Sequence, residues 1–166
     1  MRFRRGLRAG LVLALLAFAA STASAEEIQK GRKEVLGYVG WNSNNQGGVY
    51  GGGLQVGIAR RWLFAGEFGY LPVNRYSHGE EYNFNVHYLF PLKREDFTPY
   101  VLGGLGFQHF SSDVSRFSTG STHAGLNIGG GARWKLGRNW GLRPELKIFL
   151  SKYTSARYSI GLFYQF

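Results

Sequence analysis

The chain of 166 residues contains no cysteine, so no disulfide bond stabilises it. In an oxidising compartment, small soluble domains are often held together by disulfides, because their cores alone are marginal. The absence therefore indicates another source of stability, such as a closed network of backbone hydrogen bonds in a membrane.

Long hydrophobic runs are missing after residue 25. A transmembrane helix needs roughly 20 consecutive apolar residues, and no later stretch approaches that length. The apolar run Leu11–Ala20 follows four arginines and precedes the small residues at positions 23–25, an order typical of a secretory signal peptide. We expect residues 1–25 to be cleaved, leaving a domain of residues 26–166. The run is too short for the alternative, an N-terminal membrane anchor.

The net charge of +10 at pH 7 would favour an acidic partner such as nucleic acid. Four of the arginines lie in the expected signal peptide, and without them the net charge falls to +6. The remaining Lys and Arg residues are dispersed, and the chain is expected to leave the cytoplasm. We therefore expect no nucleic-acid partner.

The remaining sequence alternates between apolar and polar residues with a period of two. Alternating segments separated by turn-rich stretches at intervals of about 8–12 residues predict an all-β barrel or sandwich. In the clearest segment, Phe84 and Val86 share one face while Asn85 and His87 share the other. We predict eight strands, at Glu34–Trp41, Gly51–Ala59, Trp62–Leu71, Tyr82–Phe90, Pro99–Gln108, His123–Lys135, Gly141–Leu150 and Arg157–Phe166. The fifth segment is apolar on both faces, which leaves its register open.

Alternation alone does not say which face points inward, and a soluble ligand-binding barrel would have its apolar face inside. Aromatic residues gather near the segment ends, as the interfacial girdles of a membrane barrel require. They are Trp41, Trp62, Tyr70, Tyr82, Tyr100, Trp134, Trp140, Tyr164 and Phe166. The other face combines glycines with charged residues that can pair inside a narrow barrel. The expected interior charges are Glu67, Arg133, Arg143, Glu145, Lys147 and Arg157.

Connection lengths favour a membrane orientation. Stretches 42–50, 72–81 and 109–122 are long and polar, as outward loops should be, whereas 60–61 and 136–139 are tight turns suited to the periplasmic side. Two connections depart from this pattern: residues 91–98 are long for a periplasmic turn, and 151–156 are short for an outer loop. An even number of strands would leave both termini of the barrel chain in the periplasm.

The last eight residues resemble the C-terminal assembly signal of bacterial outer-membrane barrels. A polar residue, a glycine two positions later, an aromatic third from the end and a terminal Phe fall in register, at Ser159, Gly161, Tyr164 and Phe166. The resemblance implies recognition by the barrel-assembly machinery of a Gram-negative-type envelope.

Two further stretches, Thr98–Gly106 and Gly141–Leu146, resemble recurrent strands of the small porin-like outer-membrane β-barrels of the OmpA/OmpX type. The resemblance implies an eight-stranded antiparallel up-and-down transmembrane β-barrel in the outer membrane. Its surroundings would be outer-membrane lipid and lipopolysaccharide. Members of this family differ in activity, so the fold does not determine function.

Some such barrels are lipid-modifying enzymes, which directs attention to His109 and Ser111, followed by Asp113. Residues two apart on a strand project to the same side, as a base and a nucleophile require. The pair resembles the His-x-Ser of outer-membrane lipid A deacylases, but it follows the fifth segment, whereas those enzymes carry it on a late strand. The polar stem of a loop is the simpler interpretation.

The other histidines, His78, His87 and His123, have no spacing that indicates a metal site, although His78 with Glu80 and Glu81 could bind a cation at a loop tip. The glycine runs 51–53 and 129–131 lack the helix and the Lys-Ser/Thr of phosphate-binding loops, so barrel curvature and close strand approach explain them better. We expect no metal and no cofactor.

Two functions remain open. The first is a non-enzymatic barrel that acts in envelope integrity or in surface interaction through its outer loops. The second is a lipid A-modifying hydrolase that uses His109 and Ser111.

Overall fold

A computed structural model of the chain describes residues 30–43, 47–74, 77–90, 92, 96–112 and 119–166. The expected signal peptide, residues 1–25, lies outside the described residues, as does Asp113. Among the described residues, no helix has the length and apolar character to cross a membrane.

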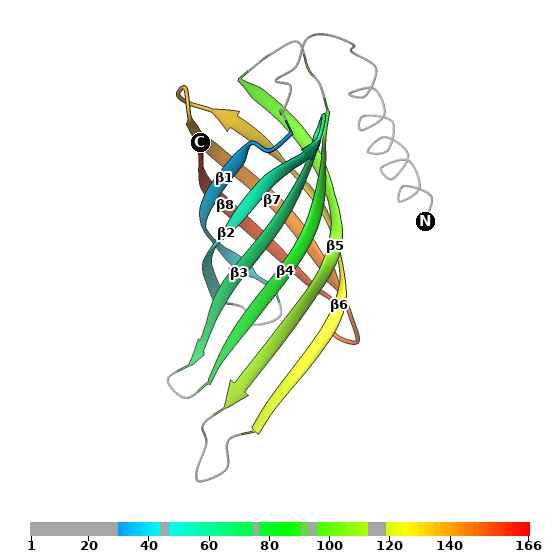
Figure 1. Cartoon of the computed structure of the whole chain (residues 1–166). Helices are drawn as coiled ribbons and strands as arrows, with labels where there is room; N and C mark the ends of the chain where they lie inside the picture. Colours follow the sequence, from blue (N-terminus) through cyan, green and yellow to red (C-terminus); the bar gives the residue numbers. More distant parts are fainter. Residues whose placement is uncertain (1–29, 44–46, 75–76, 91, 93–95, 113–118) are drawn as a thin grey trace, which may run out of the picture.

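Eight antiparallel strands close into a barrel in which each strand pairs with its neighbours in sequence and the last pairs with the first (Figure 1). The predicted eight-stranded up-and-down barrel is thus confirmed. The strands are β1 (Lys33–Asn42), β2 (Gly47–Ala59), β3 (Trp62–Asn74), β4 (Ser77–Leu89), β5 (Phe97–Ser112), β6 (Thr119–Lys135), β7 (Trp140–Leu150) and β8 (Ser155–Gln165).

The polar and charged side chains of the strands point inward together with some apolar ones, such as Leu36 and Phe163, whereas the outward faces are apolar. In β4, Asn83, Asn85 and His87 are buried, whereas Tyr82 and Phe84 are 42% and 49% exposed. The soluble ligand-binding barrel is therefore excluded, because it would have the apolar face inside. An apolar outer wall around a polar interior is the arrangement of a barrel that faces lipid.

The fifth strand, whose register was open, has Tyr100 and Leu102 inside, where they pack with Leu63 and Leu89. Tyr100 is therefore not part of an interfacial girdle, as its position near a segment end suggested. It is 2% exposed, and its hydroxyl has a partner inside the barrel.

Within the stretches predicted to be long outer loops, most of the described residues belong to strands. β3 and β4 continue to Asn74 and from Ser77, and β5 and β6 extend to Ser112 and from Thr119. The prediction was wrong because it relied on apolar alternation. Here pairing between neighbouring strands satisfies the backbone, as in the register of His78 with Ser111, although the side chains are polar.

The two ends of the barrel differ. The start of β1 and the end of β8 lie at one end, together with the β2–β3 and β6–β7 turns; we call this end the terminal rim (Figure 1). The opposite end, the hairpin end, carries the β3–β4 and β5–β6 hairpins. β5 and β6 have 16 and 17 residues, whereas β7 and β8 have 11 each, so the wall of the barrel is higher on one side.

Candidate functional site

The barrel interior is occupied by charged side chains. The six residues expected there come from β3, β6, β7 and β8, and each is 5% exposed or less. They are Glu67, Arg133, Arg143, Glu145, Lys147 and Arg157. Such burial is tolerable only when the charges are paired, so the partners of each group decide what this cluster does.

Glu67 of β3 is one centre of the cluster. Its carboxylate accepts hydrogen bonds from Arg143, from Lys147 at 3.1 Å and from Arg157 at 2.8 Å. These cations lie on β7 and β8, which are not neighbours of β3 in the sheet. The ion pairs therefore cross the lumen.

Arg157 of β8 is the second centre. Besides Glu67, its guanidinium contacts the carboxylate of Glu145 at 2.9 Å and that of Glu81. It also lies 4.4 Å from the centre of the Tyr38 ring, and its Nη1 donates to the Tyr38 hydroxyl at 2.9 Å. One arginine thus holds three carboxylates from three strands.

Glu34 and Glu81 complete the cluster and were not predicted. Arg133 binds Glu34 through two hydrogen bonds of 2.7 and 2.8 Å, and Gln165 donates a third at 2.7 Å. Strand alternation carried the signal for Glu34, which shares the inward face of β1 with Leu36, but Glu81 lay in a stretch predicted to be a loop. With these two, the described interior holds four carboxylates and four cations.

Two tyrosines also point into the interior, and glycines opposite them make room. Tyr100 donates to Glu145 at 2.7 Å. A Cβ on Gly131 would lie 2.7 Å from the Tyr100 hydroxyl oxygen, and one on Gly51 would lie equally close to that of Tyr38. Both glycine runs therefore include positions where a side chain would collide with an inward tyrosine.

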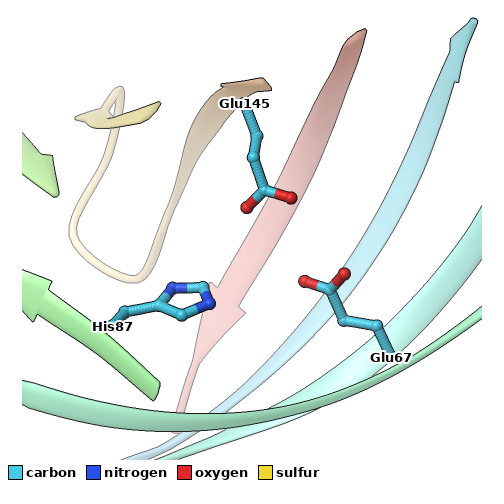
Figure 2. A group of neighbouring side chains, drawn as sticks. All are labelled: Glu67, His87 and Glu145. Carbon is cyan, nitrogen blue, oxygen red and sulfur yellow. The ribbon is translucent and has the colours of Figure 1, made fainter. Parts of the chain in front are cut away.

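The fold brings His87 beside Glu67 and Glu145, an arrangement that sequence spacing did not indicate (Figure 2). Their potential ligand atoms lie within 4.8 Å of one another. Both carboxylates, however, are already held by arginines, and His87 stacks on Tyr100 at 4.9 Å. A metal ion placed there would add positive charge to a balanced cluster, so these residues fit an ion-pair network better than a metal centre.

Beside the ion pairs lies a cluster of buried amides. Asn127 of β6 donates to the side-chain oxygens of Asn83 and Asn85 on β4, at 2.9 Å each. Together with the charged side chains, these contacts connect opposite walls of the barrel.

His109 and Ser111 lie on the outward face of β5, near the hairpin end. His109 Nδ1 is 2.8 Å from the Thr122 hydroxyl of β6, while Ser111 lies in register with Gly120. The two side chains share a side, but the hydrogen bond of His109 goes to Thr122. Of the other histidines, His78 stacks on Tyr70 at 5.5 Å.

The residues of the proposed assembly signal lie at the end of β8. Gly161 is buried against β1, where an added Cβ would come 2.7 Å from Leu36. Tyr164 and Phe166 point outward, 49% and 66% exposed.

Residues 10–166 match the family described as outer membrane protein beta-barrel domain. The chain belongs to this family. A member of this family with an apolar outer wall is an outer-membrane protein, and the predicted localisation is thereby confirmed. No curated protein sequence matches the chain.

Solved structures similar to this family member show the same fold. The N-terminal β-barrel domain of Pseudomonas aeruginosa OprF is 18% identical, with a TM-score of 0.72 over 82% of this chain and 98% of that one. Yersinia pestis Ail, also solved in complex with the heparin analogue sucrose octasulfate, is 14% identical, with a TM-score of 0.63 over 83% and 100%. The outer membrane enzyme PagL is 17% identical, with a TM-score of 0.53 over 79% and 98%.

Proposed function

We propose that this protein is a closed, non-enzymatic outer-membrane barrel that acts in envelope integrity or in surface interaction through its outer hairpins. The observation that carries the proposal is the balanced network of four carboxylates and four cations across the lumen. Eight strands enclose a space that side chains can fill, whereas water-filled channels belong to barrels of about 16 strands.

The hairpins support a role in surface interaction. β3–β4 and β5–β6 present aromatic and polar side chains on ordered strands, such as Tyr70 stacked on His78 and His109 bonded to Thr122. Ordered strands bind a partner at a lower entropic cost than flexible loops. The similar fold of Ail, seen with a heparin analogue, supports surface interaction as a role open to such barrels. Lipid and lipopolysaccharide are the proposed surroundings.

Planar-bilayer recording tests the closed interior. The purified barrel should give no stable conductance of porin size, because paired charged side chains occupy the lumen. A porin of about 16 strands, inserted under the same conditions, serves as the positive control. A reproducible, large and long-lived conductance would contradict the proposal.

The alternative is a lipid A-modifying hydrolase. The observation in its favour is that His109 and Ser111 share one side of β5 near the hairpin end, and PagL shows that an enzyme can use this fold. Mass spectrometry of lipid A separates the two functions. Cells with the wild-type gene and with Ser111→Ala should yield identical lipid A if the barrel is not an enzyme, whereas loss of an acyl chain only with wild type would establish the hydrolase.

We further propose that Ser159, Gly161, Tyr164 and Phe166 form a signal for the barrel-assembly machinery. Phe166→Ser should cause assembly to fail while export proceeds, since the proposed signal peptide for export is residues 1–25. Fractionation should find the variant in the periplasm or degraded, whereas Phe166→Tyr, which keeps an aromatic ring, should assemble better. Normal insertion of Phe166→Ser would refute the signal.

A further inference from the structure

The terminal rim is strongly basic. Among the described residues, its side chains include seven cations and one acidic group, Asp96, whereas the charged side chains that are not buried at the hairpin end are Glu80 and Lys152. The cations are Lys30, Arg32, Lys33, Arg60, Arg61, Lys135 and Arg138. We call these seven residues the basic rim.

The basic rim extends around much of the barrel wall. Its members lie just before and at the start of β1, form the β2–β3 turn, and lie at the end of β6 and in the β6–β7 turn. Backbone hydrogen bonds hold these segments together, from Gly31 to the Gly57 carbonyl and from Lys33 to the Phe166 carbonyl. The cations therefore form an arc along the wall and not a single pocket.

Aromatic side chains fix the depth of this arc in the membrane. Trp62, Trp134 and Trp140 are 42%, 48% and 45% exposed on the outer wall. Indole rings prefer the headgroup region of a bilayer. Arg61 and Lys135 are the immediate chain neighbours of Trp62 and Trp134, so their charged groups reach the depth of the lipid phosphates.

The β2–β3 turn provides an independent observation. Arg61 has a φ of 68°, in the left-handed region where glycine is most favourable and a longer side chain is strained. A position whose backbone suits glycine is occupied by an arginine beside another arginine. Folding of the turn does not explain this choice, but a charge requirement does.

We propose that the basic rim binds the phosphate groups of anionic phospholipids in the leaflet next to the terminal rim. The cations are spread along an arc beside tryptophans, which suits a layer of lipids around the barrel. In this layer each lipid headgroup would contact one or two cations. A soluble anion would be better held by a convergent pocket. This inference does not depend on the closed lumen or on the absence of enzymatic activity.

Tryptophan quenching can test the proposal, because three of the four tryptophans lie at this rim. The barrel is reconstituted in phosphatidylcholine vesicles that contain a small fraction of either phosphatidylglycerol or phosphatidylcholine brominated near the headgroup. From the quenching, brominated phosphatidylglycerol should bind next to the tryptophans with a constant about five times that of brominated phosphatidylcholine. This is the factor that one cation near an anionic surface contributes. This preference should weaken in high salt.

Arg61→Gly combined with Arg138→Gln should reduce the preference measurably, because it removes two of the seven rim cations. Arg61→Gly suits the observed φ of this position. A heat-modifiability gel reports whether the barrel remains folded. Arg138→Gln alone, at an exposed position in the β6–β7 turn, provides a second variant. Lys152→Gln, at the hairpin end, is the matched control and should keep the full preference. Equal quenching by both lipids in the wild type, or an unchanged preference in both rim variants, would overturn the proposal.

Discussion

Replacing Arg157 with methionine is expected to lower the free energy of unfolding by about 3–5 kcal/mol, the usual cost of removing one partner from a buried ion pair. The arginine holds Glu67, Glu81 and Glu145. Glu67 and Glu145 keep Arg143, but Glu81 keeps no cation partner among the described residues. Urea titration of tryptophan fluorescence in lipid vesicles measures the change.

A second variant separates charge imbalance from lost packing. Arg157→Met combined with Glu81→Gln restores three carboxylates against three cations in the described interior, so a substantial part of the loss should be recovered. If the double variant is as unstable as the single one, packing of the arginine and not its charge is responsible. If Arg157→Met leaves stability unchanged, the ion pairs do not stabilise the barrel.

Ile128→Arg should impair insertion by about 2–4 kcal/mol, the cost of an arginine near the middle of a barrel's lipid face. Ile128 points outward from β6 and is 47% exposed. It lies in register with Ile148 of β7, between the aromatic residues of the two barrel ends. The folded fraction on a heat-modifiability gel, followed over a urea series in vesicles, gives the size of the effect.

Leu136→Arg provides the matched control, because Leu136 is similarly exposed, at 45%, but lies just beyond β6 at the terminal rim. An arginine near the interface costs only about 0–1 kcal/mol. Equal damage at both positions would indicate that the outer wall is sensitive to charge at any depth. No damage at Ile128 would contradict its contact with lipid.

The strands were predictable because their signal is local. A strand with one face to lipid and one to a polar lumen must alternate, and β4, β7 and β8 show this pattern clearly. β1, β3 and β5 also carry apolar residues on the inward face, such as Leu36, Leu63 and Tyr100. The strand ends near the hairpins were not predictable in the same way. Beyond the membrane neither face has to be apolar, so Ser77–Glu81 resembled a loop.

The pairing inside the lumen depends on geometry that the sequence does not reveal. Strand parity predicted that Glu67 and Arg157 point inward. Their contact joins residues 90 positions apart, and it depends on the stagger of strands around the closed barrel. For the same reason, the nearness of His87 to Glu67 and Glu145 could not be read from spacing.

Because the strands differ in length, two sides of the barrel extend to different heights above the membrane. β5 and β6 extend beyond the shorter β7 and β8, so the hairpin end projects farther on the β5–β6 side (Figure 1). A neighbouring protein that diffuses along the bilayer meets a tall polar wall on one side and a low edge on the other. Contacts with neighbours in a crowded membrane are therefore directional.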